Sequence, residues 1–142
     1  MIRNLVPFCL SLCLMASCVD DVTNVKEQYP QQWQLLRMTG SLDDAIKTGD
    51  RLEWQEFYLL KADGTFLKSR LDDGVKTFAT GSFTFEEKED EYLLLLTYDA
   101  PTEIIGGCEP EPRETLILLS DDLLVSTWPA CDGPGLEYYR TQ

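Results

Sequence analysis

The residues of this chain that could carry chemistry are mainly carboxylates. Paired carboxylates can hydrolyse glycosides, and clustered ones can hold calcium through their oxygen atoms. The largest run, Glu86, Glu87, Glu89, Asp90 and Glu91, is interrupted only by Lys88, which is typical of a solvated turn. The spacing of a calcium loop is absent among the acidic residues expected in loops, which are Asp43, Asp44, Asp50, Asp72, Asp73, Glu103, Glu109 and Glu111. The sequence therefore predicts neither a catalytic site nor a metal site.

Histidine is missing from all 142 residues. A Ser-His-Asp or Cys-His catalytic site cannot form within a chain that lacks it, and the commonest zinc ligand is lost as well. The chain also has no glycine-rich phosphate loop and no cysteine cluster with metal-ligand spacing. We therefore expect a protein that is not an enzyme and that uses no cofactor.

The charge of the chain is strongly acidic, with a net value of −13. Arg3 is the only charged residue before Cys18, so the part from Cys18 onward carries 11 basic and 25 acidic residues and a net charge of −14. Such a surface repels nucleic-acid phosphates and anionic lipid headgroups. It suits either simple solubility or the docking of a basic protein.

Residues 1–17 have the layout of a secretory signal peptide. Arg3 supplies a positive start, and residues 5–15 form an apolar run that is too short to span a bilayer as a helix. The stretch "MASC", which ends at Cys18, resembles the lipobox of bacterial lipoproteins, although methionine replaces the usual leucine. The resemblance implies that Cys18 becomes the lipidated first residue of the mature protein.

The acidic pair in "VDD", directly after Cys18, resembles the export signal of surface lipoproteins in Bacteroidetes-type bacteria. Together these resemblances predict a membrane anchor at the cell outer membrane, with the protein periplasmic or surface-exposed. Cys9 and Cys13 fall in the segment that is removed. If Cys18 is acylated, Cys108 and Cys131 remain in an oxidising compartment and form one disulfide.

Residues 18–31 are polar and without sustained periodicity, which predicts a flexible tether, and residues 32–142 form the domain. Within it, short apolar or alternating runs are separated by turn signals, the pattern of an all-β protein. The predicted strands cover residues 33–39, 52–61, 65–71, 75–86, 91–98, 114–119, 123–128 and 135–141.

Three local features refine this strand pattern. Gly81 lies inside the fourth run, where glycine indicates a bend or a bulge. Residues 42–48 could form one helical turn in the first connection, capped by Ser41. The Asp-Gly pair at 73–74 suits the tight turn between the third and fourth strands, because it tolerates positive φ angles.

Eight sequential antiparallel strands expose two edges unless the sheet closes, so we predict an eight-stranded antiparallel up-and-down barrel. Successive loops then alternate between the two ends. The loops 99–113 and 129–134, which hold Cys108 and Cys131, fall at the same end, so the topology supports their disulfide. This end carries the long connections, and the opposite end carries tight turns.

The stretches "QQWQLLRMT", "LLKADGTFLK", "GSFTF" and "YYRTQ" resemble the small lipocalin-like domains of bacterial lipoproteins. In lipocalins a tryptophan of the first strand packs under an arginine of the last strand and closes the barrel. Trp33 and Arg140 occupy these positions here. The family usually has glycine two residues before that tryptophan, whereas this chain has Gln31.

The resemblance implies a barrel that takes a small hydrophobic ligand at its mouth, with Trp54, Tyr58 and Trp128 as the residues expected to face it. The many aromatic residues predict a small or absent cavity, because an eight-stranded barrel is just wide enough to fill with side chains. The alternative hypothesis is an acidic, surface-displayed interaction module with a filled barrel, such as an inhibitor of a basic enzyme. In either case we expect a monomer.

Overall fold

The computed structural model describes residues 27–40, 45–110 and 112–142. The signal peptide, Cys18 and Ser41 lie outside these residues. The strands are β1 (Gln31–Thr39), β2 (Ile46–Thr48), β3 (Gln55–Leu60), β4 (Thr65–Asp72), β5 (Val75–Lys88), β6 (Glu91–Tyr98), β7 (Arg113–Ser120), β8 (Leu123–Ser126) and β9 (Gly135–Arg140). Two short 3-10 helices, η2 (Gly49–Arg51) and η3 (Trp128–Cys131), lie in the connections.

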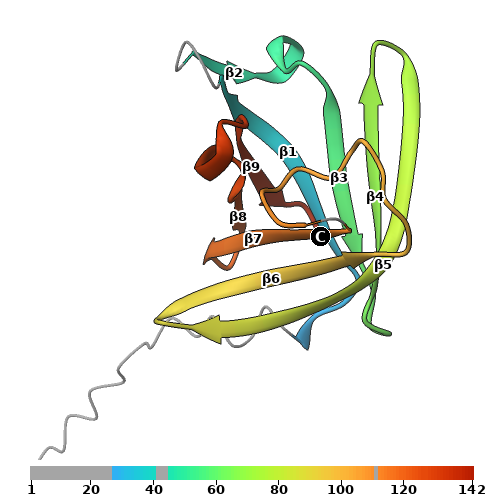
Figure 1. Ribbon diagram of the computed structural model, residues 1–142, viewed down its shortest axis with the longest axis vertical. Helices are drawn as coiled ribbons and strands as arrows, with labels where there is room; N and C mark the ends of the chain where they lie inside the picture. Colours follow the sequence, from blue (N-terminus) through green and yellow to red (C-terminus); the bar gives the residue numbers. More distant parts are fainter. Residues whose placement is uncertain (1–26, 41–44, 111) are drawn as a thin grey trace, which may run out of the picture.

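The strands form a closed antiparallel barrel (Figure 1). Strands β1 and β3 to β9 pair in sequence order, and β9 pairs with β1, so eight strands close the ring. The predicted up-and-down barrel is therefore confirmed. The register places Trp33 of β1 opposite Arg140 of β9, so the two residues expected to close the barrel are direct cross-strand neighbours.

The barrel interior follows from the two-residue alternation of each strand. Alternate residues of β6 and β7 point into the barrel. They include Leu94, Leu96 and Leu116, each no more than 1% exposed. The apolar core contains the buried residues Trp33, Leu35, Met38, Tyr58, Leu60, Phe66, Phe83, Leu94, Leu96, Tyr98, Leu116, Leu118, Leu124, Leu136 and Tyr138. Six of these fifteen side chains are aromatic, as expected for an aromatic-rich interior.

The first connection differs from the expected helical turn over 42–48. Residues 46–48 form β2, which pairs with residues 37–39 at the end of β1, and residues 42–44 lie outside the described residues. The reason is that β3 pairs with β1 only over Gln31–Gln34. The later part of β1 therefore lacks β3 as a neighbour, and β2 pairs with its last three residues instead.

The start of the domain also differs slightly from the predicted boundary at residue 32. β1 begins at Gln31, which is fully buried. Tyr29, before the strand, packs against Phe83 with ring centroids 5.8 Å apart. The side-chain packing of the barrel thus reaches into the segment assigned to the tether.

The two ends of the barrel are unequal. The β3–β4, β5–β6 and β7–β8 connections are tight turns, and the opposite end carries the longer connections after β1, β6 and β8. We call this second end the rim. The β4–β5 turn also lies there, with positive φ angles at Asp73 (46°) and Gly74 (80°), as an Asp-Gly hairpin turn requires.

Candidate functional site

A cluster of charged side chains occupies the barrel interior on the side of the rim. Lys68 of β4 lies between two carboxylates, with its Nζ atom 3.2 Å from Oε1 of Glu56 and 3.1 Å from Oε2 of Glu114. All three side chains are fully buried. They meet because β3, β4 and β7 each place a charged residue at an inward position. We call Glu56, Lys68, Arg70 and Glu114 the ionic cluster.

Arg70 supplies the second cation of the ionic cluster. Its Nε atom donates to Oε2 of Glu56, and its guanidinium also donates to the carbonyl oxygen of Ile104, 3.2 Å away. The indole ring of Trp54 lies 4.4 Å from the guanidinium carbon, a cation–π contact. Arg70 therefore connects the interior to the β6–β7 loop at the rim.

Three tyrosines complete the hydrogen bonding of the two carboxylates. Tyr58 donates its hydroxyl to Oε1 of Glu114 at 2.8 Å, Tyr98 donates to the other oxygen of Glu114, and Tyr138 donates to Glu56. Burial raises the pKa of each phenol above its usual range, and the nearby carboxylates raise it further. The phenols are therefore neutral donors at physiological pH.

The ionic cluster is neutral as a unit, because two carboxylates face two cations. The carboxylate oxygens accept hydrogen bonds from lysine, arginine and tyrosine. Burying such a group carries a large desolvation cost that good hydrogen-bond geometry offsets, so its net contribution to stability is modest. The hydrogen bonds of the ionic cluster hold the two carboxylates as acceptors and fix the relative positions of the strands that carry them.

Raising the pH should unfold the protein through these phenols. Because their pKa is higher in the folded protein than the value of about 10 in an unfolded chain, the stability they contribute is complete below pH 10 and falls as the pH rises beyond it. We expect Tyr58, Tyr98 and Tyr138 to ionise in one step together with the loss of the β-sheet signal. Absorbance at 295 nm and far-ultraviolet circular dichroism, recorded on the same samples, measure the two events.

Tyr98→Phe is the control for this titration, since it should remove one phenol from the cooperative step. Gradual ionisation of all tyrosines around pH 10, with an unchanged dichroism spectrum, would contradict the expectation. Such a result would mean that water reaches the ionic cluster in the folded state.

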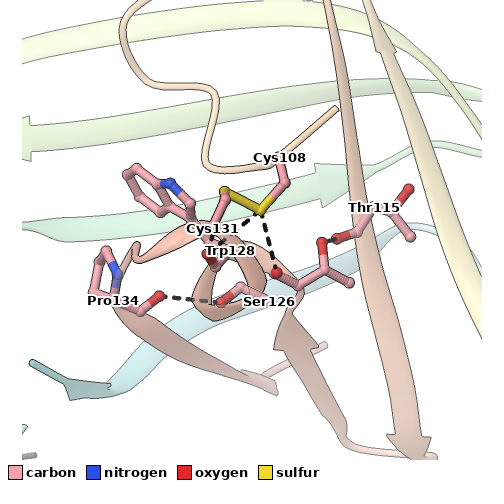
Figure 2. The surroundings of a disulfide bond; sticks show 7 residues. Cys108, Thr115, Ser126, Trp128, Cys131 and Pro134 are labelled. Atoms are coloured by element: carbon pink, nitrogen blue, oxygen red, sulfur yellow. Dashed lines mark hydrogen bonds between the residues drawn. A yellow bond between two sulfur atoms is a disulfide. The ribbon is translucent and has the colours of Figure 1, made fainter. Parts of the chain in front are cut away.

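The rim above the ionic cluster is covered by the β6–β7 loop. Ile104 of this loop is 1% exposed and lines the same groove as Arg70. Cys108, further along the loop, forms a disulfide with Cys131 of η3, as the sequence predicted (Figure 2). The bridge joins residues separated by 23 positions, and it ties the loop over the barrel to the β8–β9 connection.

Hydrogen bonds hold the connection that carries Cys131. The hydroxyl of Thr127 donates to the carbonyl oxygen of Thr115 on β7 at 2.9 Å, and the hydroxyl of Ser126 donates to the carbonyl oxygen of Pro134 at 3.4 Å (Figure 2). Oγ of Ser126 also accepts from the amide of Leu136 at 3.0 Å. Both partners of the disulfide are exposed. The rim is thus a set of loops braced by hydrogen bonds and by a disulfide between two exposed residues.

The three residues expected to face a ligand occupy different surroundings. Tyr58 is fully buried and bonded to Glu114, Trp54 stacks on Arg70, and Trp128 begins η3 at the rim. The Nε1 atom of Trp54 is buried and has no hydrogen-bond partner among the described residues. Trp54 and Tyr58 contact the ionic cluster directly, and the ring of Trp128 packs against the core.

The glutamine that departs from the family pattern has a structural role. Oε1 of Gln31 accepts a hydrogen bond from Nε1 of Trp33 at 3.1 Å, and both residues are fully buried. Arg140, opposite Trp33, donates from Nε to the carbonyl oxygen of Gln142 and from its guanidinium to that of Gln28. Gln31 therefore supplies the acceptor that a buried indole needs.

The ionic cluster itself was not among the residues singled out from the sequence. The sequence does carry a signal for it. In their strands, Glu56, Lys68 and Arg70 alternate in step with apolar residues that point inward, namely Tyr58, Leu60 and Phe66. A charged residue at an inward position requires a partner. The acidic run at 86–91 is exposed, as expected for a solvated turn.

No protein family, curated protein or solved structure matches the chain. Among the described residues, no group of three or more cysteine, aspartate or glutamate side chains is placed to hold a metal ion. The same residues contain no helix of the length and apolar character needed to cross a membrane.

Proposed function

We propose that this protein is a non-enzymatic interaction module that binds a basic protein through the loops of its acidic rim. The observation that carries the proposal is the ionic cluster. Its buried charges are neutralised by one another, and the apolar core packs beside it. With the interior occupied by the protein's own side chains, recognition falls to the outer surface. Loops on a rigid barrel are suited to this task.

The charge of the rim supports the choice of a basic partner. Exposed carboxylates there include Asp50, Glu53, Asp72, Asp73, Asp99, Glu103, Glu109 and Asp132. A surface of one sign attracts a partner of the other sign and speeds their encounter. We favour this function over the carrier of a small hydrophobic ligand, because the carrier needs an apolar interior, whereas the buried charges of the ionic cluster occupy the interior on the side of the rim.

The proposal includes a location at the cell envelope. The "MASC" stretch supports lipidation of Cys18, and it would leave the barrel tethered to the outer membrane by the residues before β1. The first strand starts at the end with the tight turns and runs toward the rim. A tether that enters at the end with the tight turns leaves the acidic rim facing away from the membrane.

Binding to lysozyme, used as a basic probe, tests the proposal. The full-length protein, expressed with its own leader and purified in a nonionic detergent, should bind lysozyme and not the acidic α-lactalbumin. Affinity should fall about tenfold or more between 50 and 500 mM salt, since exposed charges are screened over that range. Calorimetry at each salt concentration measures it. Affinity that does not respond to salt would contradict the proposal.

A pair of matched variants localises the surface. Asp72→Asn combined with Glu103→Gln removes two exposed charges at the rim, and we expect it to weaken lysozyme binding. Glu86→Gln combined with Glu87→Gln removes two exposed charges near the β5–β6 turn and should have a smaller effect. Equal effects would show that net charge, and not the rim, attracts the probe. Membrane fractionation of a Cys18→Ala variant checks the anchor in the same preparations.

A further inference from the structure

We propose that the open edge of β5 at residues 75–79 binds an extended segment of the basic partner as an additional β-strand. The inference rests on the proposed function and deepens it by naming the surface and the form of the partner. Adding a strand to an open sheet edge gives affinity through backbone hydrogen bonds and specificity through alternating side chains.

The open edge arises where β5 changes its neighbour. β5 pairs with β4 over residues 75–82, but its pairing with β6 covers only residues 81–88. Figure 1 shows the β4–β5 hairpin extending past the point at which β6 ends. Within the described chain, residues 75–79 therefore have a backbone partner, β4, on one side only.

The direction of the backbone groups on this edge follows from one hydrogen bond. The amide of Asp99 donates to the carbonyl oxygen of Thr80 at 2.9 Å, so this carbonyl points away from β4. Backbone groups two residues apart in a strand point the same way. Phe78 and Lys76 therefore also direct their N–H and C=O groups to the open side. The chain itself begins an additional pairing at Asp99 and then turns away.

Open grooves flank this edge on both faces. One of about 390 Å³, on the side of the barrel mouth, is lined in part by Arg70, Asp72, Val75 and Glu103. Another of about 250 Å³ is lined in part by Phe78, Thr80, Asp99 and Pro101. Because successive side chains of a strand point to opposite faces, a strand added here would place them alternately into the two grooves.

The residues along the edge define the chemistry of the partner segment. Val75 is 66% exposed and Phe78 is 54% exposed, so both faces offer apolar contact. Asp72 and Glu103 lie in one groove and Asp99 in the other, which favours lysine or arginine beside apolar residues in the bound strand. A second copy of this chain would bring carboxylates against carboxylates, so charge complementarity favours the basic partner.

A synthetic peptide of alternating lysine and valine, seven residues long and capped at both ends, is the probe for this edge. We expect amide hydrogen exchange of Lys76 and Phe78 to slow at least tenfold when the peptide saturates the full-length protein. The amides of Thr77 and Ala79 point toward β4 and should change less. Nuclear magnetic resonance measures each amide separately. A glutamate–valine peptide and a lysine–valine peptide with alternate N-methylated bonds should both fail to bind.

Phe78→Pro removes the outward N–H at the centre of the edge and leaves the pairing with β4 possible, as is usual for proline on edge strands. We expect it to weaken peptide binding about tenfold or more, whereas the matched variant Phe78→Val should retain most of the affinity. Thermal unfolding of both variants reports whether the hairpin is intact. If Phe78→Pro unfolds the protein, the N-methylated peptide still decides the question.

Two outcomes would overturn the inference. One is peptide binding that protects amides elsewhere, and the other is protection of Lys76 and Phe78 by self-association without peptide. Lysozyme binding with no protection at this edge would contradict the inference and leave the proposed function standing. Protection by the peptide without binding of any basic protein would contradict the proposed function instead.

Discussion

Replacing Lys68 with methionine should destabilise the protein by about 3–5 kcal/mol, the loss expected when one partner of a buried ion pair is removed. Lys68 contacts both Glu56 and Glu114, and all three side chains are fully buried. Methionine fills similar space but leaves the ionic cluster with two carboxylates and one cation, Arg70. Urea unfolding at neutral pH measures the loss, and it forms a large part of the 5–15 kcal/mol that holds typical domains together.

Two control variants separate charge from volume. Lys68→Met combined with Glu114→Gln keeps one carboxylate for one cation and should recover part of the loss, on the order of 1–2 kcal/mol. Lys61→Met removes an exposed lysine just before the β3–β4 turn and should stay within about 0.5 kcal/mol of the wild type. If the Lys68 variant were as stable as the Lys61 variant, water would have to reach the ionic cluster.

The strand order of the barrel was predictable because each strand carries its own local signal. The runs at 65–71 and 91–98 end at turn residues and contain the residues of β4 and β6 almost without change. Sequential pairing through tight turns then leaves closure as the way to avoid two exposed edges. The disulfide was predicted from the two cysteines that remain in an oxidising compartment, and this topology supported it, since alternate loops share an end of the barrel.

The ionic cluster was harder to predict because it depends on register and closure. Glu56 and Glu114 are separated by two-fifths of the chain, and they meet Lys68 only when the inward parities of β3, β4 and β7 are fixed together. A one-residue slip of any of these strands would turn its charged residue outward. The pairing of β2 with the end of β1 was also missed, because it depends on where β3 stops.

The position of Gly81 links the predicted bend to the open edge. The sequence indicated a bend or bulge at this glycine, and in the structure it pairs with Phe66 of β4 and with Tyr98 of β6. It is the point where β5 passes from one neighbour to the other. Before Gly81, β5 pairs with β4 alone. After Gly81, β5 pairs with β6 and is part of the barrel wall.

Gly81→Ala should destabilise the protein by about 3 kcal/mol, near the upper end of what overpacking usually costs. A methyl group at this position would lie 2.0 Å from the carbonyl oxygen of Thr97 and 2.8 Å from the ring of Phe66. The first contact is with backbone, so β5 and β6 would have to separate where the β4–β5 hairpin leaves the barrel. Urea unfolding measures the change in the free energy of unfolding.

Gly107→Ala is the matched control, because a methyl group there would meet its nearest atom, Cα of Glu114, at an ordinary 3.6 Å. We expect this variant to remain within about 0.5 kcal/mol of the wild type. Equal losses from both substitutions would mean that the barrel wall yields at Gly81 as easily as a surface loop does. A selective loss at Gly81 would instead establish that the absence of a side chain there lets β6 approach β5 at the point where the β4–β5 hairpin leaves the barrel wall.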